Sequence, residues 1–149
     1  MAELKADRAI RELGVGVPGK PKDGEYHEYQ FPSNVTSLQI DELGMLMSKL
    51  TAWYSYTLCE LGQYEGNLIA LKDFFETGIM QYAEDKMPNK LIEYKAIEAD
   101  EKIKKAKQGI SDLKSIVARM QRLCDAYKAS IDLCSRELSR RQLEFNLTR

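Results

Sequence analysis

One repeat in the second half of the chain constrains its fold more than any other feature. From Ile92 to Phe145, apolar or small side chains recur at alternating spacings of four and three residues, with Arg141 as the one charged member. A strand would repeat every two residues, so this period predicts one continuous helix of more than fifty residues with a narrow apolar seam. Such a helix would run about 80 Å and cannot form a core alone, so its seam must be covered by another long helix.

A first long helix is predicted to begin near Ser37. Thr36 and Gln39 have the spacing of a capping box, and acidic residues follow in the opening turns, where the helix dipole favours them. Its own seam runs from Leu43 to Phe75 in the same steps of four and three. Gly78 and the Met-Pro-Asn sequence at 87–89 are expected to end it, with Asn89 as the N-cap of the second helix.

These patterns predict an all-α fold in which two long helices form an antiparallel hairpin, or coiled-coil-like bundle, that assembles as an oligomer. We expect two regions. Residues 37–149 form the long-helix hairpin for oligomerisation and binding. Residues 1–36 contain a short helix at 1–13, a Gly/Pro-rich linker at 14–24 and an extended aromatic segment from Tyr26 to Phe31.

The second predicted helix outruns the first by about fourteen residues, so the part beyond Tyr127 has no predicted partner within the hairpin. A second subunit would cover it, and extra apolar residues beside both seams favour bundles of three or more helices. Packing against the N-terminal segment is the alternative. The residues expected to form the oligomer seam are Ile110, Leu113, Val117, Met120, Tyr127, Ile131 and Leu138.

Composition disfavours several classes of protein. No run of eighteen apolar residues and no signal-peptide core is present, so we expect a cytoplasmic protein that does not enter membranes. The three cysteines are an odd number without paired ligand spacing, so neither disulfides nor a metal site are expected. His27 is the single histidine, and Pro21 stands where a phosphate-binding loop needs serine or threonine. We expect neither an enzyme nor a cofactor.

The net charge of −1 hides an asymmetry. Residues 1–89 hold 8 Lys/Arg against 14 Asp/Glu, whereas residues 90–149 hold 14 against 9. A basic helix of this kind can bind a polyanion, or its charges can be the solvated flanks of a coiled coil, and charge alone does not choose between them. The candidate phosphate-binding residues on the second helix are Lys102, Lys104, Lys105, Lys107, Lys114, Arg119 and Arg122.

Two short runs in the first helix resemble a known family. The sequence MLMSK at 45–49, followed by ALKDFF at 70–75, is similar to the UvsY-type recombination mediators of tailed phages. In that family a second long helix follows, as it is predicted to do here, and the resemblance spans roughly residues 41–145 by architecture more than identity. The family segment before the aromatic pair carries an arginine and a lysine, whereas Lys72 is the clearly basic residue here.

The resemblance implies a homo-oligomer that binds single-stranded DNA and helps load a RecA-like recombinase onto strands covered by single-strand binding protein. It implies Lys72 as a phosphate contact, and Phe74 and Phe75 could stack on bases. If the chain is phage-encoded, its location is the host cytoplasm. Two alternatives stay open: a coiled-coil structural or assembly-chaperone protein with no nucleic-acid role, and an adaptor that uses its acidic N-terminal half on a basic partner.

Overall fold

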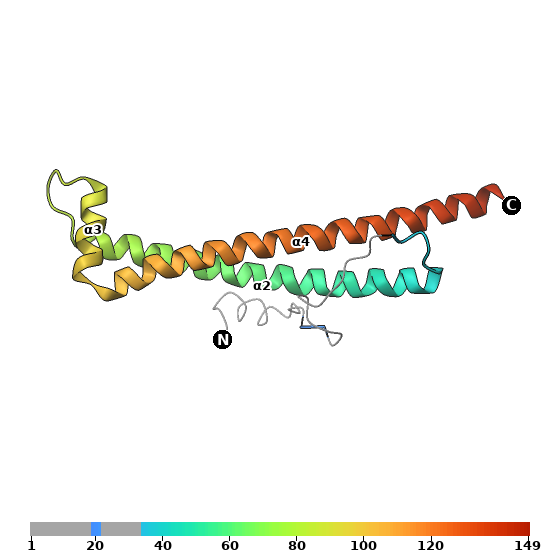
Figure 1. Cartoon of the computed structure of the whole chain (residues 1–149), viewed down its shortest axis with the longest axis horizontal. Coiled ribbons are helices and arrows are strands. Elements are labelled where there is room, and N and C mark those ends of the chain that lie inside the picture. Colours follow the sequence, from blue (N-terminus) through green and yellow to red (C-terminus); the bar gives the residue numbers. More distant parts are fainter. Residues whose placement is uncertain (1–18, 22–33) are drawn as a thin grey trace, which may run out of the picture. The chain divides into compact units, whose positions relative to one another are not determined.

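The computed structural model describes residues 19–21 and 34–149, and the described part is built from helices (Figure 1). The helices are α2 (Ile40–Met80), α3 (Asn89–Ala99) and α4 (Glu101–Leu147). The predicted short helix at 1–13 and the aromatic segment from Tyr26 to Phe31 lie outside the described residues. The all-α prediction is confirmed, with two long helices that pack against each other.

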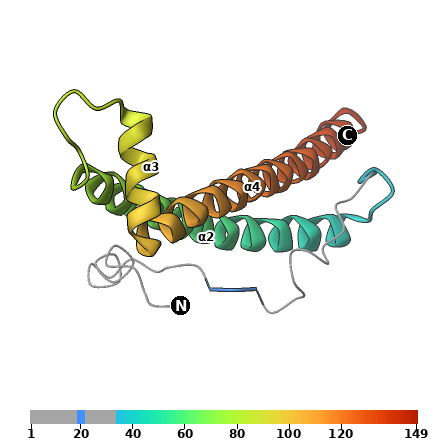
Figure 2. The ribbon, with the colours of Figure 1, turned by 60° about the vertical axis from the view of Figure 1, so that its left-hand side comes forward.

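The prediction of one unbroken helix from Ile92 to Phe145 is wrong, because the helix is interrupted at Asp100. The backbone of Asp100 is extended, with φ −134° and ψ 112°, and its carboxylate accepts a hydrogen bond from the N–H of Lys102 at 2.9 Å. Asp100 is thus the N-cap of α4, a position that favours aspartate because the side chain satisfies an otherwise unpaired N–H. The chain turns there, and α3 and the first turns of α4 run in different directions (Figure 2).

The start of α2 also differs from the prediction. Glu42 accepts a hydrogen bond from the backbone N–H of Gln39 at 2.9 Å, which is the carboxylate half of a capping box one turn later than expected. Thr36 instead donates its hydroxyl hydrogen to the side chain of Asn34 at 2.6 Å. After the loop that connects α2 to α3, Pro88 occupies the N-cap position of α3. Asn89, the predicted cap, is the first helical residue of α3.

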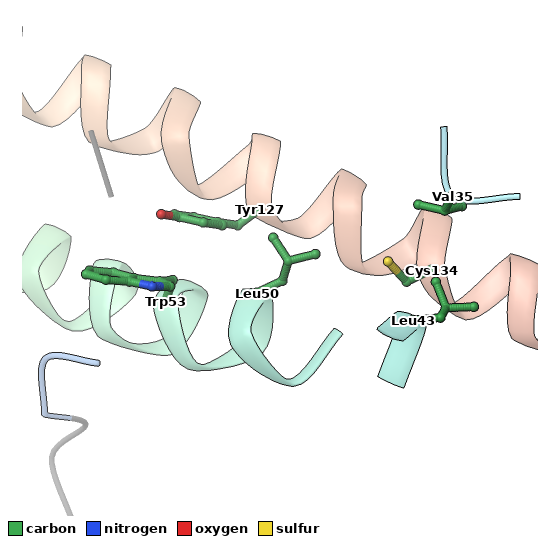
Figure 3. Close-up of a cluster of buried hydrophobic side chains, with 6 residues drawn as sticks. All are labelled: Val35, Leu43, Leu50, Trp53, Tyr127 and Cys134. Carbon is green, nitrogen blue, oxygen red and sulfur yellow. The ribbon is translucent and has the colours of Figure 1, made fainter. Parts of the chain in front are cut away.

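The described chain forms two compact units, and the division between them cuts across both long helices. The boundary after residue 36 stays a prediction. The described part of the first unit contains residues 34–60 and 120–149, together with 19–21. Within it, the start of α2 packs antiparallel against the end of α4 (Figure 3). Its buried cluster consists of Val35, Leu43, Leu50, Trp53, Tyr127 and Cys134.

The second unit, Leu61–Arg119, contains the end of α2, all of α3 and the start of α4. Ile92, Ala96, Ile103 and Ala106 are buried there. α4 lies close to α2 at Gly109, where an added Cβ would lie 2.9 Å from a methyl carbon of Leu71. Glycine at this point lets α4 lie directly against α2, because any larger side chain would displace the leucine.

The segment beyond Tyr127 has a partner inside the chain, contrary to the expectation of a bare overhang. Cys134 is fully buried in a cluster with Val35 and with Leu43 of α2, and Glu137, one turn further along α4, is 6% exposed. The physical reason is the break at Asp100: α4 has 47 residues against 41 in α2, so the two helices nearly match in length. This result agrees with the alternative in which the chain before α2 packs against the second long helix.

Candidate nucleic-acid interface

The lysine cluster lies on the outer face of α4 because the inner face of the same turns is buried. Ile103 is 2% exposed and Ala106 is 4% exposed, and both face the interior of the second unit. Lys104 and Lys105, which come between these two positions, point away from the buried stripe of the helix, and Lys102 and Lys107 flank the stripe. The lysines at 102, 104, 105 and 107 are accordingly all exposed.

Four of the predicted residues line a single groove where the end of α3 meets the start of α4. Ile97 of α3 and Ile110 of α4 contribute apolar surface to it, and Glu101 is the one acidic side chain. Four amines around an apolar surface suit a flexible polyanion, since the amines contact phosphates while bases lie on the apolar part. The lysines that line the groove are Lys104, Lys105, Lys107 and Lys114.

Lys102 points elsewhere, into a second groove that Phe74 of α2 also lines. Phe74 is 49% exposed, so about half of its surface is in contact with solvent. Asp73 and Asp100 line the same groove, and two carboxylates against one amine make it a poorer site for phosphate than the four-lysine groove.

The other predicted contacts are not gathered into these grooves. Lys72 and Phe75 are half-buried on α2, and they line neither groove. Arg119 and Arg122 are exposed on α4, but Arg119 ends the second unit while Arg122 belongs to the first.

The predicted oligomer seam is at least partly the core of one chain. Tyr127 is fully buried and Met120 is 8% exposed, while Ile131 and Leu138 pack against the buried cluster of the first unit. Ile110, Leu113 and Val117 are half-buried. That these side chains also meet a second chain stays a prediction.

An ion pair across the break was missed by the sequence reasoning. The amine Nζ of Lys107 lies 2.5 Å from Oε1 of Glu93 on α3, so one lysine of the four-lysine groove is already paired with a carboxylate. No sequence signal indicated this contact. In an unbroken helix the two residues, fourteen positions apart, would be separated by about 21 Å along the axis.

A second network, at the end of α4, fixes the chain before α2. The guanidinium of Arg141 donates through Nη2 to the carbonyl oxygens of Thr36, at 3.3 Å, and Leu38. Its Nε donates to Glu137 at 2.8 Å. Hydrogen bonds from Arg140 and Arg141 lower the pKa of Glu137 to about 2, because they stabilise the charged carboxylate more than burial destabilises it. In the sequence, the one sign of this network was that Arg141 is the single charged residue in the apolar repeat.

Other kinds of site are not seen in the described residues. Within 19–21 and 34–149, no three or more His, Cys, Asp or Glu side chains are grouped so that they could hold a metal ion. None of the described helices combines the length and the apolar character needed to cross a bilayer. His27 lies outside the described part of the chain.

Comparison with known proteins does not identify a relative. No protein-family model, curated protein or solved structure matches the chain. The resemblance to UvsY-type mediators therefore rests on the short sequence runs and the helical architecture.

Proposed function

We propose that this protein binds single-stranded DNA as a homo-oligomer and promotes the loading of a RecA-like recombinase onto strands coated with single-strand binding protein. The observation that carries the DNA-binding part is the groove lined by Lys104, Lys105, Lys107 and Lys114, with one acidic residue among its lining. A groove with apolar side chains in its lining, here Ile97 and Ile110, favours single strands over duplex, because unstacked bases are free to contact those side chains.

The neighbouring groove adds a stacking surface to the proposed site. Phe74 and Lys102 line this groove, so an aromatic ring that can stack on a base lies near an amine, although Asp73 and Asp100 make it the weaker phosphate site of the two. Because Lys102 and Lys104 are on the same turn of α4, one strand could contact both grooves within this unit.

Oligomer formation is supported by apolar side chains that the hairpin leaves uncovered. Leu143 is 64% exposed and Leu147 is 85% exposed, at the end of α4 beyond the last turn that packs on α2. A lysine groove binds weakly at physiological salt, and several copies in one assembly would raise the effective concentration of sites along a strand. The double variant Leu143→Ser/Leu147→Ser should lower the mass measured by light scattering while helicity is retained.

The DNA-binding part is tested with a fluorescent oligonucleotide titrated at several salt concentrations. Changing all four groove lysines to glutamine should weaken binding about equally for every sequence. It should also reduce the slope of log K against log salt by up to about 2.8, which is 0.7 for each lost phosphate contact. Glutamine has a helix propensity close to that of lysine, so folding should survive.

A matched control variant changes four lysines outside the groove to glutamine, and so removes the same amount of positive charge. Lys86, Lys90, Lys95 and Lys128 are exposed, and none of them lines the four-lysine groove. If the control variant loses as much affinity as the groove variant, net charge and not the groove determines binding. A parent protein that assembles but binds neither single-stranded nor duplex DNA would leave the coiled-coil assembly protein as the better explanation.

Loading is tested separately, because binding and loading can be independent. The readout is DNA-dependent ATP hydrolysis by a RecA-like recombinase on single strands already coated with single-strand binding protein. The parent should shorten the lag before hydrolysis, and the four-glutamine variant should not. A parent that binds strands but leaves the lag unchanged would restrict the function to DNA binding.

A further inference from the structure

The ion pair between Glu93 and Lys107 places a carboxylate where a phosphate of a bound strand would lie. Lys107 lines the four-lysine groove, and its amine is 2.5 Å from the carboxylate of Glu93. Both side chains remain in contact with water, with 58% of Lys107 and 32% of Glu93 exposed. The pair can therefore open without exposing a buried charge.

The break at Asp100 creates this arrangement. The N-cap at Asp100 ends α3 and lets it turn, and Ile92 and Ala96 then bury one face of α3 within the second unit. Glu93 follows Ile92 directly, so the packing of α3 delivers its carboxylate to α4. A residue fourteen positions away on the same helix could not reach Lys107.

We propose that Glu93 is a built-in competitor for the groove: single-stranded DNA binds fully when a phosphate replaces the Glu93 carboxylate at Lys107. This inference rests on the proposed DNA-binding function and names a residue that tunes it. An exposed ion pair is weak, so the competition lowers affinity by a factor of about two to five and does not abolish binding. The effect is reversible, as a protein that must later release its strand requires.

The salt dependence separates this role from a merely structural one. When a phosphate takes Lys107, the released carboxylate of Glu93 attracts a cation, which offsets part of the counterion release from the strand. Removing the carboxylate ends that offset. Glu93→Gln should therefore bind single strands about two to five times more tightly and show a salt slope steeper by up to about 0.7.

The matched control is Glu98→Gln, which removes one negative charge from an exposed position of the same helix. It should raise affinity less than Glu93→Gln, because position 98 does not pair with a groove lysine in the structure. A double-mutant cycle completes the test. In a Lys107→Gln background, Glu93→Gln should gain no more affinity than Glu98→Gln does, since the amine for which carboxylate and phosphate compete is absent.

The experiment is an oligonucleotide titration of the full chain, with circular dichroism to confirm folding, and Glu93→Ala serves as a second carboxylate-free variant if the glutamine variant folds poorly. Equal affinities for Glu93→Gln and Glu98→Gln, or additive effects in the cycle, would overturn the inference while the parent still binds DNA. A parent that binds no single-stranded DNA would overturn the proposed function and this inference together.

Discussion

Asp100 is the residue whose replacement tests the fold most directly. Its carboxylate caps α4 through the N–H of Lys102, and its extended backbone separates two helices that the apolar repeat would join. Asp100→Ala removes a cap worth about 1 kcal/mol. It also replaces a poor helix former by the best one, which favours the helical conformation at this position by about 0.7 kcal/mol.

Both effects favour a continuous helix, and together they shift the balance by about 1.7 kcal/mol, which is more than tenfold in population. Amide hydrogen exchange followed by NMR reports the change. Residues 101–103 form the first turn of α4, where intrahelical partners for N–H groups are missing. If α3 and α4 join, these amides gain partners in the preceding turn and their exchange should slow.

Asp100→Ser is the matched control, because serine also caps helices well. It should keep the parent's exchange rates at residues 101–103 and most of its stability against urea. If Asp100→Ala leaves both exchange and stability unchanged, or if serine and alanine behave alike, the cap does not determine the break. A joined helix would also move Glu93 away from Lys107. If exchange slows in Asp100→Ala, this variant should therefore bind single-stranded DNA about as tightly as Glu93→Gln does.

Three further predictions concern stability. Hydrogen bonds from the neighbouring arginines hold the pKa of Glu137 at about 2, so its contribution to the free energy of unfolding is complete above about pH 4.3 and is lost as pH falls towards 2. The melting temperature of Glu137→Gln should therefore depend less on pH in this window than that of the parent, and an equal pH dependence would contradict the network. Leu50→Ala should lower the free energy of unfolding, measured in urea, by about 2–5 kcal/mol, whereas Leu58→Ala, at a 42% exposed position, should lower it clearly less. Equal losses would contradict the assigned core. Gly62→Ala should raise the free energy of unfolding by about 0.5–1 kcal/mol, because the added Cβ meets nothing within 4 Å. Gly109→Ala should raise it less, because its Cβ would press on a methyl group of Leu71, and equal gains would contradict the close contact between α4 and α2 at Gly109.

The candidate site was partly predictable because its residues are close in sequence. Lys104, Lys105 and Lys107 are within two turns of one helix, so a helical prediction alone places them on neighbouring positions. Their grouping with Ile97, and the separation of Lys102 into a groove with Phe74, depend on contacts between different helices. Glu93 was missed for the same reason.

The sequence by itself determined that the chain forms long helices, because the spacing of apolar residues has one period and each helix must bury its seam. It also located the end of the first helix near Gly78 and the new start to within one residue, since the predicted cap Asn89 is the first helical residue of α3. These features depend on local chemistry: a repeat along one face, a proline that cannot continue a helix, and a residue that caps one.

Only the tertiary structure decided where the second helical stretch breaks and what covers its far end. The seam continues through Ala96, Ala99 and Ile103, so periodicity does not reveal the interruption, and Ala99 proves to be exposed. A joined and a broken helix differ locally by only about one or two kcal/mol, which packing of Ile92 and Ala96 can reverse. Likewise, Arg141 reaches the carbonyl groups before α2 from more than a hundred residues away. Contacts between such distant segments are set by which surfaces bury together, and no local pattern contains that information.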